Sequence, residues 1–433
     1  MSRELLERLL ASRLPDPDGP GMLAVPTRKV AIAKSLAGEE AALIADLGFG
    51  RHLSVVSDPA TRSVLGARVA GALGAVAEVQ ELVLEAAPAA DSETVARIRA
   101  ATAASGALVA VGSGTINDLC KHASFLDGKP YAVFGTAPSM NGYTSVSAAI
   151  TEHGHKKSLP AHAPLGVFLD LAVLAAAPVR MIRSGLGDSI CRPTAEADWL
   201  LAHLLLGKPY RTAPFRLLEQ DEAALLARPA ALVAGDTGAM GILARTLVLS
   251  GFGMTICGGS YPASQGEHLI SHYIDMMGDP AWPPSFHGEH IAVTALTMAR
   301  LQAAMTGPSA PVLAATGVDE AAVRRHFGAE LGASCWAAFA KKAMNEADAA
   351  ALNARLRRDW PETRAALGRV MRPPAEIEAA LKAAGAPIRP ADIHVPADFY
   401  RRAVRHAREI RDRYTFLDLA ADSGRLDTLA ETA

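Results

Sequence analysis

Paired cysteines, long apolar runs and an excess of one charge sign are all missing from this chain of 433 residues. Its cysteines form no CxxC pair, which excludes a zinc ribbon and a dithiol redox motif. Scattered thiols are typical of a reducing compartment, and they occur here at Cys120, Cys191, Cys257 and Cys335. No stretch approaches about 18 uncharged apolar residues, so we expect no membrane span.

Positive and negative charges nearly cancel along the chain. Lys and Arg number 43 and Asp and Glu number 45, so the net charge is −2. A chain with this balance has no overall field that recruits nucleic acid or anionic lipid. Residues 1–14 mix acids and bases and lack the apolar core of a secretory signal. We therefore expect a soluble cytoplasmic protein with neither a nucleic-acid partner nor a membrane partner.

Short apolar runs alternate with helical patterns in the first part of the chain. Strands separated by helices of about 10–15 residues predict right-handed βαβ units and a parallel, Rossmann-like sheet. The strands are expected at residues 29–32, 52–56, 76–84, 107–111, 131–134 and 167–169. Helices are expected at residues 37–47 and 60–73, and a third, capped by Asp91, ends near residue 103.

After Pro178 the pattern becomes helical throughout, broken by Gly and Pro and with few β-branched runs. The sequence therefore predicts two domains, which fits a length that allows two or three. An α/β domain is expected over residues 1–178, and an all-helical domain over residues 179–433.

A glycine-rich turn follows the strand predicted at residues 107–111. The chain continues Gly112-Ser-Gly114-Thr and then a helical segment, and free N–H groups at the start of such a helix bind anions. The spacing matches neither GxGxxG nor the P-loop. It indicates either a cradle for nucleotide phosphates or an ordinary strand–helix turn. Asp58 closes an earlier strand, where a carboxylate can bind ribose hydroxyls.

A second Gly/Ser loop, residues 135–145, follows the next strand. It is expected at the carboxyl edge of the sheet, where open α/β sheets bind ligands. Hydroxyls from Thr136, Ser139 and Ser145 can contact a phosphate or a nicotinamide amide there. An ordinary loop has the same composition, so the two interpretations stay open.

Four of the 13 histidines fall within residues 268–290. His268 and His272 are spaced i,i+4, which places them on one helix face, and His287 begins another helix-like segment. Neutral imidazoles with one carboxylate suit Zn²⁺, Fe²⁺ or Ni²⁺ and leave a coordination position open for substrate. Asp188, in Gly-Leu-Gly-Asp, can supply that carboxylate or can simply cap a helix.

Taken together, these segments resemble the glycerol-1-phosphate dehydrogenase family, particularly its bacterial branch. The resemblance spans roughly residues 27–425, and it rests on GSGTINDLCK, TAPSMNGYTS, GLGDSICRPTAEADWLL, GEHLISH, HGEH and RDRYTFLDLA. That family belongs to a larger group of glycerol dehydrogenases, iron-containing alcohol dehydrogenases and dehydroquinate synthases. The resemblance implies a dehydroquinate synthase-like fold, with an α/β domain followed by a helical one.

The resemblance also implies a metal-dependent, NAD(P)-linked dehydrogenase that interconverts dihydroxyacetone phosphate and sn-glycerol 1-phosphate, or a related small polyol phosphate. One divalent metal (zinc, nickel or iron) would be held by Asp188, His268 and His287, and His272 with Asp188 would contact the substrate. NAD or NADP would be bound by Asp58, Gly114, Thr115, Ile116, Asn117, Asp118, Thr136, Ala137, Pro138, Ser139 and Ser145. A homodimer and a role in phospholipid metabolism are implied as well.

One residue departs from the family pattern. The family's substrate-contacting aspartate falls at Asn141 here, and Asn keeps the shape and one acceptor oxygen but carries no charge and takes no proton. Two alternatives therefore stay open. One is a dehydroquinate synthase-like lyase or cyclase that uses NAD and metal without net redox on a sugar phosphate. The other is a non-catalytic nucleotide-binding relative.

Three further features of the sequence concern basic residues and the choice between NAD and NADP. Lys157 is a candidate cation for the substrate phosphate, or a solvated surface lysine. The Arg-rich segment 401–413 is expected to be a solvated face with mixed charges. Asp58 should repel the 2′-phosphate of NADP while Arg62 could accept it, so the sequence does not choose between NAD and NADP.

Overall fold

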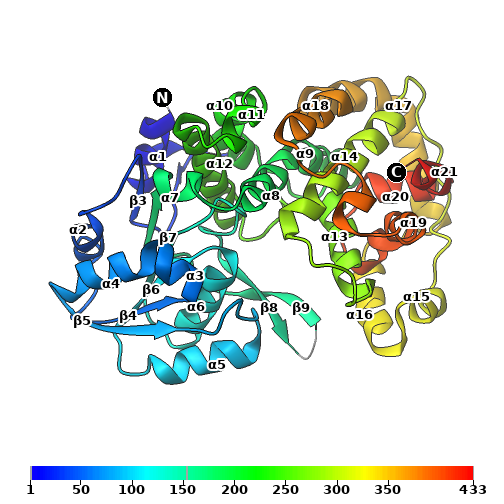
Figure 1. Cartoon of the computed structure of the whole chain (residues 1–433). Helices are drawn as coiled ribbons and strands as arrows, with labels where there is room; N and C mark the ends of the chain where they lie inside the picture. The colour runs from blue at the N-terminus through cyan, green and yellow to red at the C-terminus, as the bar shows by residue number, and fades with distance from the viewer. Residues whose placement is uncertain (1, 153–154, 433) are drawn as a thin grey trace. The chain divides into compact units, whose positions relative to one another are not determined.

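The alternating patterns at the start of the chain build a six-stranded parallel sheet (Figure 1). The computed structural model describes residues 2–152 and 155–432. In spatial order the strands are β3 (Lys29–Ala33), β10 (Gly166–Asp170), β7 (Tyr131–Gly135), β6 (Ala107–Gly112), β4 (His52–Ser57) and β5 (Glu78–Val83). All six predicted strands are confirmed to within two residues. Every residue of β6, β7 and β10 is buried, as parallel strands covered on both faces require.

The predicted helices between these strands also form. Asp91 accepts the backbone N–H of Thr94 at 2.8 Å and caps the third of them, as expected. These helices are α2 (Glu40–Ala45), α3 (Pro59–Thr61), the π turn η1 (Arg62–Gly66), α4 (Ala67–Gly74), α5 (Ser92–Ala101) and α6 (Gly114–Leu126). The main difference is α2, which is shorter than the expected 37–47.

Two antiparallel pairs of strands were not predicted. Strands β8 (Ser147–Glu152) and β9 (His155–Pro160) pair antiparallel between β7 and β10 in the sequence. Strands β1 (Leu14–Pro15) and β2 (Met22–Leu23) form a second, two-residue pair. Neither pair joins the parallel sheet.

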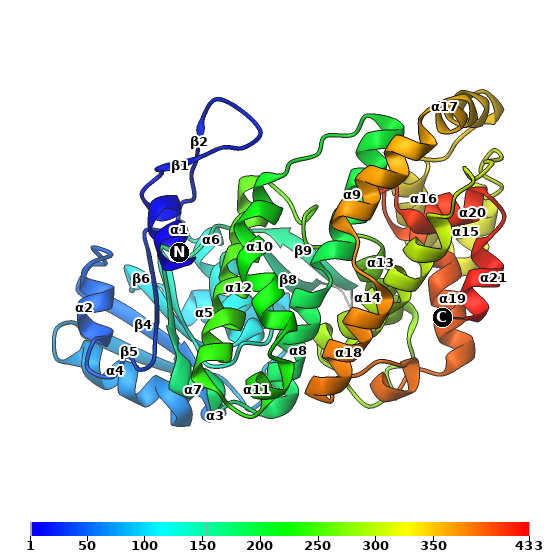
Figure 2. The ribbon, with the colours of Figure 1, turned by 90° about the horizontal axis from the view of Figure 1, so that it is seen from above.

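The chain packs into two compact units. Unit 1 comprises residues 1–189 and 212–260, and unit 2 comprises residues 190–211 and 261–433. This division differs from the predicted boundary at residue 178, because helices after Pro178 belong to unit 1. Helix α12 (Thr237–Ile256) contacts β3 and lies beside α10 (Ala213–Leu226) (Figure 2). Helix α8 (Val179–Ile190) ends at the unit boundary. The predicted domains 1–178 and 179–433 stay a prediction.

The remaining helices of unit 1 are α1 (Ser2–Leu10), α7 (Leu171–Ala175), α8 (Val179–Ile190), α10 (Ala213–Leu226), α11 (Pro229–Val233) and α12 (Thr237–Ile256). Helix α12 is long and apolar enough to cross a membrane, with a mean hydropathy of 1.5 over its best window. In the structure 72% of that window is buried, which is typical of a core helix in a soluble protein. Arg245 and four glycines interrupt the apolar run of α12, so the sequence alone did not mark it out.

Unit 2 is helical in the part of the chain that the structure describes, as the periodicity predicted. Its longest helices enclose a core that includes Leu201, Ile270 and Tyr400. The helices are α9 (Arg192–Leu206), α13 (Gly266–Met277), α14 (His287–Met305), α15 (Glu320–Phe327), α16 (Ala329–Phe339), α17 (Glu346–Val370), α18 (Pro374–Ala384), η2 (Pro390–Ile393), α19 (Ala397–His406), η3 (Ala407–Ile410), α20 (Phe416–Asp422) and α21 (Leu426–Glu431).

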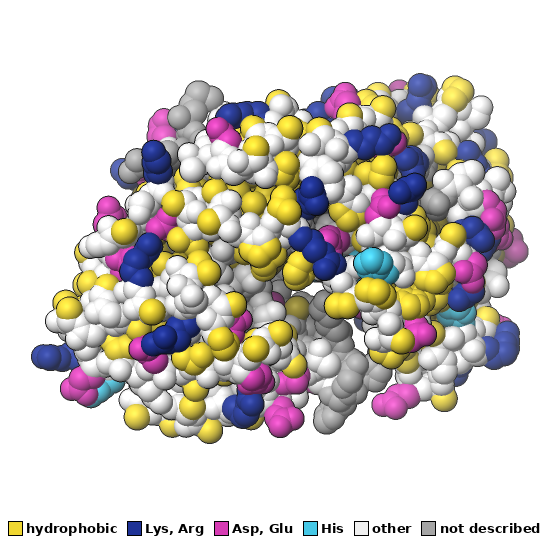
Figure 3. All heavy atoms as spheres, viewed as in Figure 1, with side chains coloured by type: hydrophobic (Ala, Val, Ile, Leu, Met, Phe, Trp, Pro, Cys, Tyr) yellow, Lys and Arg dark blue, Asp and Glu magenta, His cyan; other side chains and the backbone are white. Residues whose placement is uncertain are grey.

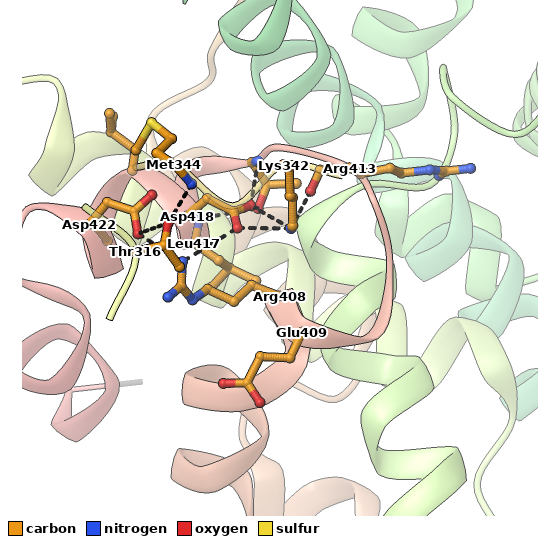
Figure 4. Close-up of polar contacts among 12 residues, drawn as sticks. Thr316, Lys342, Met344, Arg408, Glu409, Arg413, Leu417, Asp418 and Asp422 are labelled. Atoms are coloured by element: carbon orange, nitrogen blue, oxygen red, sulfur yellow. Dashed lines mark hydrogen bonds and ion pairs between the residues drawn. The ribbon is translucent and has the colours of Figure 1, made fainter. Parts of the chain in front are cut away.

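A buried ionic network fixes the chain around η3 and α20 in unit 2 (Figure 4). Lys342 Nζ lies 2.8 Å from Asp418, and Arg408 Nη1 lies 3.0 Å from Asp422. The expectation that segment 401–413 is a solvated face is therefore wrong for Arg408, which is only 5% exposed. Its guanidinium turns inward because two buried carboxylates compensate its charge. Over the face drawn in Figure 3, acidic and basic side chains are interspersed, in keeping with the net charge.

A second buried carboxylate ties the sheet of unit 1 to its helices. Asp170, at the end of β10, accepts the N–H of Leu36 at 3.1 Å and Arg68 Nη2 at 2.8 Å. Burial alone would raise the pKa of Asp170, but these donors together with the N–H of Val173 outweigh burial and hold the pKa below its usual value. A carboxyl with a lowered pKa stabilises the fold above its unfolded pKa of about 3.9, and this contribution is lost as the pH falls through the folded value.

Replacing Asp170 with Asn is therefore expected to lower the free energy of unfolding at pH 7 by about 1–3 kcal/mol. The difference from the wild type should shrink as the pH falls below about 4, because the wild-type carboxyl then becomes protonated and loses its charge. Urea denaturation across a pH series measures both effects. Asp398→Asn, which removes an exposed partner of Arg402, is the control and should cost less than about 1 kcal/mol. An equal loss at every pH would contradict the assignment.

Candidate functional site

The two glycine-containing loops lie next to each other at the carboxyl edge of the sheet, as predicted. The register pairs Gly112 at the end of β6 with Gly135 at the end of β7. The chain beyond them stays joined, since Thr136 N–H donates to Gly112 O at 3.1 Å. Ligands of open α/β sheets bind at this edge.

The turn between β6 and α6 has the form of an anion site. A Cβ at position 112 would lie 2.5 Å from Cβ of Ile116, so glycine lets the helix start directly above the strand. Ser113, the N-cap residue, makes no side-chain cap hydrogen bond. The first N–H groups of α6, at Gly114 and Thr115, therefore face the carboxyl edge of the sheet, and the Ser113 side chain does not cap them. N–H groups at a helix start that are not capped are able to bind a pyrophosphate.

Asn117 and Asp118 of α6 contact the protein interior in this structure. Asn117 is fully buried, and its Nδ2 donates to Asp118 Oδ1 at 3.0 Å. Asp118 Oδ2 accepts the N–H of Ala149 in β8 at 3.0 Å. Their contacts support the backbone of the turn and of the β8–β9 pair, and a direct contact with NAD(P) stays a prediction for both.

The loop from Thr136 to Ser145 is closely packed. Tyr143 Oη donates to Ala137 O at 2.7 Å, and Ser184 of α8 donates to Ser139 O at 3.0 Å. Ser145 Oγ donates to backbone carbonyls within its own segment, so its hydroxyl has a structural role here. All the predicted cofactor residues of this loop are buried, namely Thr136, Ala137, Pro138, Ser139 and Ser145.

Asp58 ends β4 at the same edge, as predicted. Its Oδ1 accepts the N–H of Thr61 at 2.7 Å, and Thr61 Oγ1 accepts the N–H of Asp58 at 3.0 Å. This capping box orients the carboxylate at the start of α3. The cap explains why an acid follows the strand, and ribose binding by Asp58 stays a prediction.

Asn141 and Asp188 are neighbours within unit 1. The N–H of Asn141 donates to Asp188 Oδ2 at 2.7 Å, and both side chains are buried. Asn141 Nδ2 is buried without a hydrogen-bond partner among residues 2–152 and 155–432. A buried amide donor in this state costs about 1–3 kcal/mol, so a ligand oxygen is its natural partner. Asp188 lies in the last turn of α8, and the N-cap of the following helix α9 is Cys191, so Asp188 is the N-cap of neither helix.

Two predicted metal ligands converge within unit 2. His268 is near the start of α13 and His287 is the first residue of α14, and their Nε2 atoms lie 3.3 Å apart. Two imidazole nitrogens that bind one tetrahedral zinc, each at about 2.0–2.1 Å, are about 3.3 Å apart. The pair therefore fits a single divalent ion. Asp188 belongs to unit 1, so its part in the same site stays a prediction.

Glu267 and Asp198 hold the imidazole pair in place, and neither was predicted from the sequence to be a site residue. His268 Nδ1 lies 2.9 Å from Glu267 Oε1. A proton on Nδ1 directs the lone pair of Nε2 toward His287, as in the carboxylate–histidine pairs of metal sites. Asp198 accepts the N–H of Gly266, the first residue of α13, at 2.9 Å. Burial and the nearby Glu267 raise the pKa of Asp198 to about 8.

The two other histidines of the cluster differ in position. The ring centroid of His272 lies 6.0 Å from that of His268 and 6.3 Å from that of His287, near enough to reach a substrate held there. His290 Nδ1 instead lies 3.6 Å from Asp275, a contact between α13 and α14. Lys157 is exposed and pairs with Glu152 at 3.2 Å, which is the behaviour of a solvated surface lysine.

Parts of the chain match known protein families. The family model of the iron-containing alcohol dehydrogenases matches residues 31–178. A glycerol-1-phosphate dehydrogenase [NAD(P)+] from Bacillus licheniformis is 31% identical over 287 residues, which cover 65% of this chain and 72% of that protein. The Pyrococcus furiosus enzyme of the same name is 33% identical over 275 residues, covering 63% of this chain and 78% of that protein.

Solved structures show the same fold at lower identity. A maleylacetate reductase from Agrobacterium tumefaciens matches with a TM-score of 0.64 and 18% identity, covering 95% of this chain and 97% of that one. A probable glycerol dehydrogenase from Sinorhizobium meliloti matches with a TM-score of 0.61 and 19% identity, covering 94% and 98%. At these identities the likeness concerns the fold.

Proposed function

We propose, since this chain belongs to the glycerol-1-phosphate dehydrogenase family, that it is an NAD(P)-linked oxidoreductase of a small polyol phosphate. The reaction is reversible hydride transfer between NAD(P)H and dihydroxyacetone phosphate, with sn-glycerol 1-phosphate as the product. The observation that carries the proposal is the pair of Nε2 atoms of His268 and His287, which are 3.3 Å apart.

The nucleotide would be held by unit 1. The first N–H groups of α6 face the carboxyl edge of the sheet, where they would bind the pyrophosphate. Asp58 at the end of β4 would accept the hydroxyls of the adenine ribose. The loop from Thr136 to Ser145 would complete the nicotinamide side, because its register with the turn at Gly112 brings both loops to one edge.

The metal would be held by His268 and His287, with Asp188 as the third ligand. When bound, a divalent cation supplies Lewis-acid polarisation of a substrate carbonyl. Glu267 fixes the ring of His268 through its 2.9 Å contact with Nδ1, so that Nε2 keeps its direction whether or not the ion is present.

The substrate would be oriented by two further side chains. Asn141 Nδ2, which has no partner among the described residues, would donate to a substrate oxygen. His272 lies within 6.3 Å of both imidazole rings, measured between centroids, and would hold the proton that passes to or from the substrate oxygen.

Protein loaded with Zn²⁺ or Ni²⁺ is expected to oxidise NADH or NADPH when dihydroxyacetone phosphate is added. Asn141→Asp should lower kcat/KM by about tenfold, since the variant loses the amide donor and places a second carboxylate beside Asp188. The absorbance of the reduced nicotinamide measures both. Asn353→Asp is the control, because that amide hydrogen-bonds to the backbone of Leu313 in unit 2, and its kinetics should match the wild type.

Two outcomes would count against dihydroxyacetone phosphate as the substrate. The first is an inactive wild type whose Asn141→Asp variant gains turnover. The second is NAD that survives purification and is never consumed, which indicates a reaction without net redox on a sugar phosphate.

The finer assignments belong to the same proposal. We expect a cytoplasmic homodimer that uses zinc or nickel. Asp58 favours NAD, because its carboxylate repels the 2′-phosphate of NADP. The guanidinium of Arg62 pairs with Glu81 at 2.8 Å, so it is less available to a 2′-phosphate. NAD is therefore expected to bind more tightly than NADP. Titration with NADH and NADPH, metal analysis and the sedimentation velocity of the purified protein test these points.

A further inference from the structure

Lys121 of α6 is fully buried in unit 1, which is rare for a lysine. Its Nζ donates to Gly142 O at 2.5 Å, to Ser145 Oγ at 3.1 Å and to Ser147 O at 3.1 Å. Two acceptors lie in the loop between β7 and β8, and the third, Ser147, is the first residue of β8. The lysine thus uses its full set of donors on this loop and on the start of the strand that follows.

The burial of Lys121 is costly, and only charge-assisted contacts compensate for it. Burial lowers the pKa of Lys121, and Asp118, 3.5 Å away, partly offsets this effect. Hydrogen bonds from a charged donor are shorter and stronger than those between neutral groups. A methionine of similar length would fill the space but would leave the carbonyls of Gly142 and Ser147 without this donor.

The loop that Lys121 contacts carries residues proposed to bind the nucleotide and a residue proposed to bind the substrate. Gly142, whose carbonyl accepts from Lys121, directly follows Asn141, whose N–H donates to Asp188 at 2.7 Å. The loop is therefore held from α6 on one side and from α8 on the other. Within a few residues of these contacts lie Pro138 and Ser139, which are proposed to contact the nucleotide.

We infer that Lys121 is a positioning residue that holds the loop between β7 and β8 in the shape that binds NAD(P) and orients Asn141. The inference rests on the proposed function of this loop. Lys121 acts through the backbone of Gly142 and Ser147, with no contact to the reacting atoms required.

The test compares Lys121→Met with Lys129→Met. Lys129 Nζ also donates to two backbone carbonyls, those of Thr102 and Ala103, at 2.7 and 3.1 Å, but on the segment after α5. We expect Lys121→Met to raise the Kd for NADH, measured by nicotinamide fluorescence without substrate, by 10-fold or more. The Kd of Lys129→Met should stay within twofold of the wild type. Thermal unfolding of both variants is recorded alongside.

Each outcome decides the question. A Lys121→Met protein with a lowered Tm and an unchanged Kd overturns the positioning role, as does an equal change of Kd in both variants. If Lys121→Met does not fold, Lys121→Arg and Lys121→Gln take its place, with an expected Kd increase of severalfold, and an unchanged Kd in both overturns the inference. A wild type that binds neither NADH nor NADPH refutes the proposed function itself, whereas a wild type that binds alongside an unaffected Lys121→Met refutes only the inference.

Discussion

Replacing His268 with Ala is expected to abolish stoichiometric metal binding and to lower kcat/KM for dihydroxyacetone phosphate by about 1000-fold or more. The variant removes one of two Nε2 atoms that lie 3.3 Å apart, and a single remaining imidazole with a carboxylate holds a divalent ion weakly. Lewis-acid stabilisation is worth several kcal/mol, and each 1.36 kcal/mol is a factor of ten in rate. Metal content by plasma emission and NADH oxidation measure the two effects.

Two companion variants distinguish a lost ligand from a damaged fold. His203→Ala removes a histidine of unit 2 whose Nδ1 lies 2.7 Å from the carbonyl of Lys208, and it should keep both metal and activity. Glu267→Gln keeps His268 but weakens the partner of its Nδ1, so metal affinity should fall by about 10–100-fold. Full activity of a metal-free His268→Ala protein would exclude the metal from the mechanism.

The parallel sheet was predictable because its strands are local signals. Residues 107–111 are uniformly apolar and end in glycine, and a strand that is buried on both faces has this composition. Strands β8 and β9 were missed because Ala, Ser, Lys and Pro dominate them and the alternation of period two is weak. Their pairing is decided by tertiary contacts such as that of Ala149 N–H with Asp118, which no local pattern records.

The candidate site was predictable in its chemistry and much less in its supports. His268 and His287 stand out because histidine is sparse elsewhere and the two begin separate helices. Glu267 adjoins His268 in the sequence, yet only the fold shows that its carboxylate contacts Nδ1 of that ring. The same holds for Lys121, whose neighbours on the helix give no sign that its side chain turns inward. The hydroxyl of Ser145 bonds within its own segment, a contact that no local pattern records, and its contact with the cofactor stays a prediction.

Gly185 allows α8 to pack closely against the loop that follows β7. A Cβ at this position of α8 would lie 1.6 Å from the carbonyl oxygen of Pro138 and 2.8 Å from its carbonyl carbon. The helix therefore touches the backbone of the loop directly. Ser184 holds Ser139 O on one side of this contact, and Asp188 holds the N–H of Asn141 on the other.

Gly185→Ala is consequently expected to lower the free energy of unfolding by about 3 kcal/mol, at the upper end for overpacking, because backbone atoms must move. The loop would be displaced from α8, so the Kd for NADH should rise by more than 10-fold. Gly71→Ala is the matched control: this helical glycine of unit 1 has open space around the added methyl, and the variant should be slightly stabilised. Chemical denaturation and nucleotide titration separate the two effects. A Gly185→Ala protein with wild-type stability and wild-type NADH affinity would show that the loop can move away from α8 without consequence. The contact between Asn141 and Asp188 would then not be needed for nucleotide binding.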